Sequence, residues 1–150
     1  MGELGVKNRT AIQAYELEGW IEEGLIKYMG VSDNVEQVIA KCDCVVLPSY
    51  REGMPRAILE AFAMKKPVIV SDVPGCIDIV ENAVNGLICE VKSSIDLAVK
   101  IVNMFSLSED IRQEMASNGR NKVEKFFDEK IVINVYLESI NCMTGNEKII

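Results

Sequence analysis

The sequence predicts an α/β protein built around a parallel sheet. Short apolar runs, long enough for a buried strand and too short for a helix, alternate with stretches that have helical spacing. After residue 89 the pattern becomes wholly helical. With 49% apolar residues, a chain of 150 residues can bury a sizeable core. We therefore expect one domain, with an irregular start over 1–12, a core over 13–142 and a tail over 143–150.

Four apolar runs bounded by turn residues are the candidate strands. They are Leu25–Met29, Cys44–Leu47, Val68–Val70 and Gly86–Cys89. Each run is nearly continuous in apolar residues, which is typical of strands buried on both faces of a parallel sheet. The first residues of the chain contain no such run, so we expect the first strand of the domain to be missing.

Helical spacing of apolar residues predicts the remaining elements. The first three helices are expected at Ala14–Glu23, Val35–Lys41 and Arg56–Met64. Three more are expected after the last strand, at Ile95–Phe105 with Ser94 as its cap, from Ser108 to about Phe127, and at Asp128–Asn141.

Composition excludes several classes of function. A net charge of −7 and a pI near 4.7 argue against a nucleic-acid partner, which requires a basic surface. No apolar run approaches the roughly 18 residues of a membrane span, and no signal peptide is recognisable. The five cysteines form no Cys-x-x-Cys pair, and the chain has no histidine, so we expect reduced thiols and no metal. These features predict a cytoplasmic protein.

The segment Leu47–Ala61 is the main candidate for a site. An apolar strand runs into a loop and then a helix, which is where doubly wound sheets bind their ligands. The helix should begin near Pro55, because proline is favoured at the first helical position. The free N–H groups of that helix end are suited to a phosphate, and Arg51 or Arg56 would add positive charge.

Two glutamates lie in this segment, Glu52 in the loop and Glu60 inside the helix. A carboxylate at Glu60 could accept hydrogen bonds from both hydroxyls of a ribose, and Glu52 could bind a polyhydroxylated group such as a sugar. Gly53 would let the backbone approach such a ligand closely. From spacing alone, two solvated glutamates that flank a helix start remain an open alternative.

The sequence of this segment and of the residues on either side of it resembles that of a known family. The quoted residues are Gly30, Asp33-Asn34-Val35, Ala40-Lys41-Cys42-Asp43, Leu47-Pro48-Ser49-Tyr50-Arg51-Glu52-Gly53, Glu60-Ala61, Pro67-Val68, Asp72-Val73-Pro74-Gly75 and Asn85-Gly86-Leu87. They are similar to the donor-binding, C-terminal half of the retaining GT-B glycosyltransferases of family 4 type, the glycosyl transferases group 1. The resemblance covers about residues 10 to 142. Lys65 follows the third predicted helix at a position where this family commonly has glycine, so the resemblance implies a left-handed conformation there.

This resemblance implies a Rossmann-like three-layer domain with a helical C-terminus, which is one half of a GT-B fold. It implies that Glu52 contacts the donor sugar and that Glu60 holds the ribose of a nucleotide diphosphate sugar. Backbone amides of Gly53 and Met54 would hold sugar and phosphate oxygens. Main-chain groups around Tyr28, Met29 and Gly30 would contact the base. Ser49, Pro55 and Arg56 complete the expected donor-binding set.

The wording is most similar to bacterial enzymes that extend lipid-linked oligosaccharides or surface polysaccharides from UDP-sugars. The resemblance implies a hexosyltransferase that needs no metal and no cofactor besides the donor. The acceptor would bind to an N-terminal domain that this chain lacks, so we expect the isolated domain to be inactive. In the full-length protein, peripheral attachment to the inner membrane is expected.

Two alternatives remain open at this point. The chain could be a stand-alone nucleotide-binding module without catalysis, or the separately encoded half of a two-chain transferase. The last predicted helix also carries apolar residues, which are Val132, Val135, Leu137 and Ile140. We expect association between copies of the chain through this surface.

Overall fold

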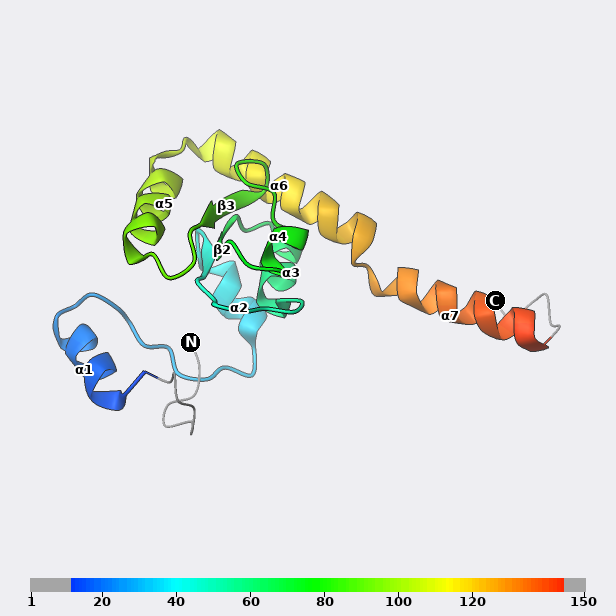
Figure 1. Ribbon diagram of the computed structural model, residues 1–150, viewed down its shortest axis with the longest axis horizontal. Helices are drawn as coiled ribbons and strands as arrows, with labels where there is room; N and C mark the ends of the chain where they lie inside the picture. The colour runs from blue at the N-terminus through cyan, green and yellow to red at the C-terminus, as the bar shows by residue number, and fades with distance from the viewer. Residues whose placement is uncertain (1–11, 145–150) are drawn as a thin grey trace. The chain divides into compact units, whose positions relative to one another are not determined.

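The computed structural model describes residues 12–144. It divides into two compact units, 1–38 and 39–150, and each is described by itself. Figure 1 shows the order of the elements along the chain. The expectation of one continuous domain over 13–142 stays a prediction.

The second unit contains a sheet of three parallel strands in the order β1-β2-β3, of which β2 and β3 are labelled in Figure 1. The strands are β1 (Val45–Leu47), β2 (Val68–Ser71) and β3 (Gly86–Cys89). The central strand β2 is buried along its whole length, as expected for a strand covered on both faces. Three of the four predicted strands are thereby confirmed.

The predicted strand Leu25–Met29 is wrong, because these residues adopt no regular structure. A strand exists through hydrogen bonds to a neighbouring strand, and within 12–144 the sheet ladder pairs only β1 with β2 and β2 with β3. Leu25 is 67% exposed, and Met29 is 51% exposed. An apolar run alone therefore misled the prediction at this point.

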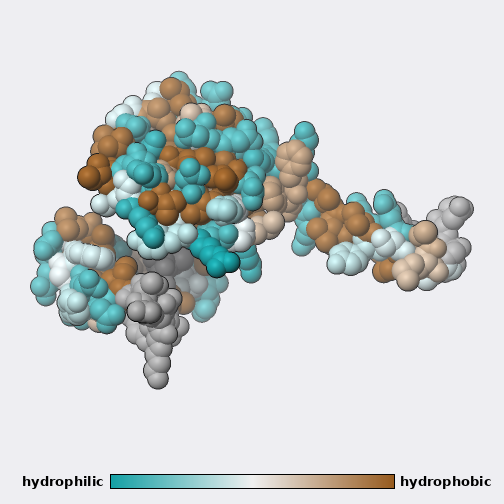
Figure 2. All heavy atoms as spheres, viewed as in Figure 1, coloured by the Kyte–Doolittle hydropathy of each residue, from teal (hydrophilic) through white to brown (hydrophobic). Residues whose placement is uncertain are grey.

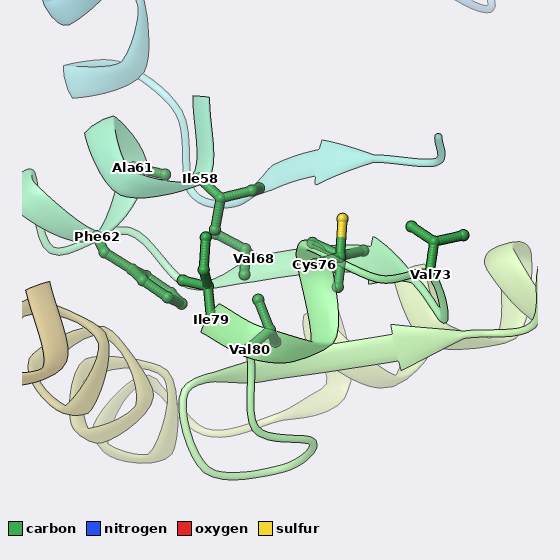
Figure 3. Packing of buried hydrophobic residues seen from close by; sticks show 9 residues of the cluster. Ile58, Ala61, Phe62, Val68, Val73, Cys76, Ile79 and Val80 are labelled. Atoms are coloured by element: carbon green, nitrogen blue, oxygen red, sulfur yellow. The ribbon is translucent and has the colours of Figure 1, made fainter. Parts of the chain in front are cut away.

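Helices cover both faces of the sheet. Val68 and Val70 of β2 pack in one apolar cluster with α3 (Arg56–Ala63) and α4 (Cys76–Ile79). Figure 3 shows Val68 among the residues of these two helices. Ile69, which points to the opposite face, packs in a second cluster with residues of α5 (Ser94–Ser106). The three-layer arrangement expected from the sequence is confirmed.

Helix α6 (Glu109–Phe126) fixes the position of α3. A Cβ at Gly119 would lie 2.3 Å from the ring of Phe62, so only glycine allows this close packing. The Arg120 side chain donates a 2.7 Å hydrogen bond from Nη1 to the carbonyl of Ala63 at the end of α3. This bond supplies a partner for a carbonyl group that the helix itself leaves free.

The end of α3 confirms the left-handed conformation expected at Lys65, where φ is +53°. The Lys65 N–H donates to the carbonyl of Phe62, and the Lys66 N–H donates to that of Ala61. These two bonds form a Schellman motif. The chain thereby reverses direction after α3 at Lys65, a position where glycine is usual because it lacks a Cβ.

The caps of α5 and α6 are serines. Ser93, and not the predicted Ser94, caps α5, because its hydroxyl accepts a 3.2 Å hydrogen bond from the Asp96 N–H. Ser108 caps α6 as predicted, with a 3.4 Å hydrogen bond from the Ile111 N–H. The α5 helix therefore begins one residue earlier than the prediction.

The first unit contains α1 (Ala14–Glu22) and the first residues of α2 (Val35–Ala40), which ends in the second unit. Both helices match their predicted ranges to within one residue. The Glu16 side chain of α1 accepts a 3.0 Å hydrogen bond from the Gln13 N–H, which stabilises the start of the helix.

The last helix of the second unit, α7 (Glu129–Thr144), has no buried residue. Its apolar side chains remain accessible, with Val132 57% exposed and Tyr136 67% exposed, and brown residues are visible along it in Figure 2. Within 12–144, every helix is too short or too polar to cross a bilayer.

Candidate functional site

The loop 48–55 joins β1 to α3 at the carboxyl edge of the sheet. All three strands are parallel, so the loops that follow them meet at this same edge. Two polar residues of the loop, Ser49 and Glu52, are half-buried. The predicted strand, loop and helix are thus present where the sequence placed them.

Ser49 and Glu52 are directly bonded. The Ser49 hydroxyl donates a hydrogen bond of 2.6 Å to Oε1 of Glu52. This short O–H to carboxylate distance is typical of a charge-assisted hydrogen bond, which is stronger than one between neutral groups. A carboxylate has about four acceptor positions, so Glu52 can accept further hydrogen bonds from a ligand.

The start of α3 lies next in the chain. Pro55 occupies the position before the first helical residue, with φ −73° and ψ 98°, and no side chain caps the helix. The Pro55 carbonyl accepts from the N–H of Ile58 at 3.0 Å, and the helix begins at Arg56. Pro55 is buried in the turn that leads into the helix. The N–H groups of Arg56 and Ala57 are left at the positive end of the helix.

Gly53 and Met54 form the exposed tip of this loop. The loop rests on Gly75, which lies between β2 and α4. Gly75 has φ +83°, and a Cβ on it would lie 2.1 Å from the carbonyl oxygen of Gly53. Glycine is thus required by both its backbone conformation and the close approach. Sequence reasoning gave Gly75 no role, although the Pro74-Gly75 pair is a recognisable turn signal.

Glu60 lies one turn further along α3, where its side chain is 37% exposed. Its Oε1 lies 3.8 Å from the guanidinium of Arg56, whose side chain is 89% exposed. An exposed pair four residues apart on a helix contributes little to stability, so both groups can exchange this contact for a ligand.

The charge of the Glu52 carboxylate acts on the thiol of Cys76. Burial, followed by the Glu52 carboxylate and then Cys89, raises the pKa of the Cys76 thiol from 9.0 to about 11. Cys76 is the first residue of α4 and is fully buried. The Glu52 carboxylate therefore lies close enough to the start of α4 for its charge to act on this thiol.

Tyr50 belongs to a different surface of the same loop. Its ring lies 5.7 Å from the ammonium group of Lys92, which follows β3, in a cation–π contact. A hollow of about 420 Å³ lies beside this pair, lined by Pro48, Tyr50, Ser71, Cys89, Glu90, Lys92, Ser93, Ser94 and Leu97.

The remaining predicted site residues belong to the first unit. Tyr28 and Gly30 are half-buried, Met29 is exposed, and Gly30 has φ +67°. The structure therefore groups Ser49, Glu52 and the start of α3 in one continuous segment, and leaves Tyr28–Gly30 in a separate unit. The roles of all these residues toward a ligand stay predictions.

Comparison with known proteins shows which family the chain resembles. The family model described as glycosyl transferases group 1 matches residues 2–122. A Campylobacter jejuni relative, N,N'-diacetylbacillosaminyl-diphospho-undecaprenol alpha-1,3-N-acetylgalactosaminyltransferase, is 34% identical over 119 residues, covering 79% of this chain and 31% of that protein. The capsular polysaccharide biosynthesis glycosyltransferase CapM of Staphylococcus aureus is 31% identical, covering 81% of this chain and 34% of CapM. The chain thus spans about a third of the length of these relatives.

Solved structures share the fold. Anabaena Alr3699/HepE in complex with UDP matches with a TM-score of 0.76 and 28% identity, over 85% of this chain and 36% of that one. The complex of the same protein with UDP-glucose matches with a TM-score of 0.75 and 28% identity, over the same shares of the two chains. The C-terminal domain of a glycosyl transferase group 1 protein (LpcC) from Francisella tularensis matches with a TM-score of 0.64 and 29% identity, over 75% of this chain and 61% of that one.

Proposed function

Because the chain belongs to the glycosyl transferases group 1 and has the fold of a C-terminal GT-B domain, we propose that it binds a nucleotide-sugar donor, most simply a UDP-sugar. The donor site is formed by the β1–α3 loop and the first two turns of α3. The observation that carries the proposal is the combination, in one segment, of an uncapped helix start with two carboxylates, Glu52 and Glu60, that can accept hydrogen bonds.

Each part of the segment suits one part of the donor. The free N–H groups at the start of α3 favour the diphosphate, because the helix end is positive there. Glu60 can accept hydrogen bonds from both ribose hydroxyls, and Glu52 can accept them from the sugar. The expectation that Tyr28–Gly30 contact the base stays a prediction about the first unit. The HepE complexes support a UDP-sugar as the ligand, since that protein is solved with UDP and with UDP-glucose.

We assign the whole protein to transfer of a hexose unit with retention of configuration, in bacterial surface polysaccharide or lipid-linked oligosaccharide synthesis. The Campylobacter jejuni relative, whose name contains a diphospho-undecaprenol acceptor, supports a lipid-linked acceptor. Such an acceptor would place the enzyme at the membrane surface as a peripheral protein. The remaining two thirds of the relatives' length would supply the acceptor site, so we expect no transfer by these 150 residues alone.

The proposed reaction needs no nucleophile from this chain. The leaving diphosphate gains negative charge as the bond to the sugar breaks, and the N–H groups at the start of α3 stabilise that charge. Glu52 accepts hydrogen bonds from the sugar hydroxyls and so holds the sugar in place. The acceptor hydroxyl oxygen attacks the anomeric carbon as the bond to the diphosphate breaks, and the acceptor proton passes to the leaving phosphate oxygen. We propose that no metal takes part, as in the group that the sequence resembles.

Calorimetric titration with UDP tests the nucleotide half of this proposal. We expect wild type to bind UDP, and Glu60→Ala to bind it at least tenfold more weakly, because two hydrogen bonds to a charged group are lost. Glu114→Ala is the matched control, since Glu114 is an exposed glutamate on α6. Wild type that shows no binding at millimolar UDP would contradict the proposal.

A further inference from the structure

We infer that Ser49 is a positioning residue, which fixes the Glu52 carboxylate for the donor sugar rather than contacting the donor itself. The inference rests on the proposed function, because it assigns the sugar to Glu52. It differs from the sequence-based expectation, which placed Ser49 directly among the donor-binding residues.

The hydrogen bond between the two residues carries the inference. The Ser49 hydroxyl lies 2.6 Å from Oε1 of Glu52 and is its donor. A serine hydroxyl has one proton to donate. Because Glu52 receives it, Ser49 has no proton left for an oxygen atom of the donor. The serine therefore acts on the ligand through the carboxylate.

The two residues differ in how firmly the backbone holds them. Ser49 lies two residues after β1, which is fixed by the ladder to β2. Glu52 lies at the turn of the loop and has a side chain with three rotatable bonds. Among residues 12–144, the Ser49 hydroxyl is the one hydrogen-bond partner that the structure gives the Glu52 side chain. Ser49 thus ties a flexible carboxylate to the rigid sheet.

This arrangement predicts an effect on the sugar and not on the nucleotide. Oε1 of Glu52 is occupied by Ser49, so Oε2 and the remaining lone pair of Oε1 are available to the sugar hydroxyls in a fixed orientation. Loss of the Ser49 hydroxyl lets the carboxylate rotate. Binding of the sugar must then order the Glu52 side chain, and this loss of entropy weakens the binding. Binding of UDP uses other groups and should be unaffected.

The first test compares UDP with UDP-glucose, UDP-galactose and UDP-N-acetylgalactosamine by calorimetry, using the most tightly bound sugar as the probe. For Ser49→Ala we expect about a fivefold loss of affinity for that UDP-sugar and less than a twofold change for UDP. Ser49→Thr keeps the hydroxyl and should restore the affinity to within twofold. Glu52→Gln should lose the same sugar preference, and adding Ser49→Ala to it should cost nothing more.

Equal loss of UDP and UDP-sugar affinity in Ser49→Ala would overturn the inference, as would an unchanged preference for the sugar. A wild type that binds neither ligand would instead overturn the proposed function. Ligand-free crystal structures then still decide the role of Ser49. Glu52 should adopt one rotamer in wild type and Ser49→Thr, and several in Ser49→Ala. A single unmoved Glu52 rotamer in Ser49→Ala would also overturn the inference.

Discussion

Gly75 is the residue on which the shape of the candidate site depends most directly. A Cβ at this position would lie 2.1 Å from the carbonyl oxygen of Gly53, and φ is +83°. We expect Gly75→Ala to lower the free energy of unfolding by about 2 kcal/mol or more, because backbone strain and a clash add. Urea denaturation measures this change.

Gly53→Ala is the matched control for the Gly75 prediction. A Cβ on Gly53 would meet no atom within 4 Å, so its stability should change by less than about 0.5 kcal/mol. An equal loss of stability in the two variants would show that the loop does not rest on Gly75 in the way described. Displacement of the loop should also weaken UDP binding in Gly75→Ala.

Two thiols make stability depend on alkaline pH. Burial, followed by the charge of Asp43 and then Cys42, raises the pKa of Cys44 from 9.0 to about 12, and the pKa of Cys76 is raised to about 11. When a thiol has a higher pKa in the folded state than in the unfolded state, its contribution to stability is fully present at a pH below the unfolded-state pKa. This contribution is lost as the pH rises through the folded-state pKa. We therefore expect part of the free energy of unfolding to be lost between pH 9 and 12.

Paired urea titrations at pH 8 and pH 10.5 check the role of the thiols. The difference in midpoint between the two pH values should be smaller in the Cys44→Ala, Cys76→Ala double variant than in wild type. Cys142→Ala is the control, because Cys142 is exposed and should leave the pH dependence unchanged. A double variant with the wild-type pH dependence would contradict the assignment.

At the scale of an element, the end of α3 contains removable strain. Lys65 occupies a left-handed conformation with φ +53° in the Schellman motif. Lys65→Gly should raise the free energy of unfolding by up to about 1 kcal/mol, because glycine adopts this conformation without a Cβ clash. Lys66→Gly removes the same charge at a residue outside the left-handed region and should not stabilise. Thermal unfolding of both variants compares them.

Two adjacent serines have different roles at the start of α5. Ser93 accepts the hydrogen bond from Asp96, whereas Ser94 is the first helical residue. Ser93→Ala should cost about 1 kcal/mol of stability, the typical effect of losing a side-chain cap. Ser94→Ala should be neutral or slightly stabilising, since alanine favours a helix. The reverse order would contradict the assigned cap.

The sequence predicted the elements of the second unit well where pattern and local chemistry agreed. β3 was placed correctly because turn residues bound its apolar run. The start of α3 was placed correctly because a proline directly precedes the helix. The strand at Leu25–Met29 failed because an apolar run does not reveal whether a neighbouring strand is there to pair with. The role of Gly75 was missed because it depends on contact with a loop more than twenty residues away in the chain.

At the scale of the whole molecule, the exposed apolar side chains of α7 predict association between copies. Val132 is 57% exposed and Tyr136 67%, and they lie four residues apart on one face. Sedimentation should show oligomers of wild type at high concentration and a larger monomer fraction for Val132→Lys combined with Tyr136→Lys. Glu138→Lys is the charge-matched control. A monomeric wild type would contradict this prediction.

The central claim is that the β1–α3 segment binds a nucleotide diphosphate sugar. Backbone amide NMR of the ¹⁵N-labelled chain, titrated with UDP, tests it most directly because each residue reports separately. We expect the largest saturable shifts at Gly53, Met54 and Arg56, and none in the α6 residues around Glu114, which lie outside the β1–α3 segment. Saturable shifts confined to other parts of the chain, or no shifts at millimolar UDP, would contradict the claim.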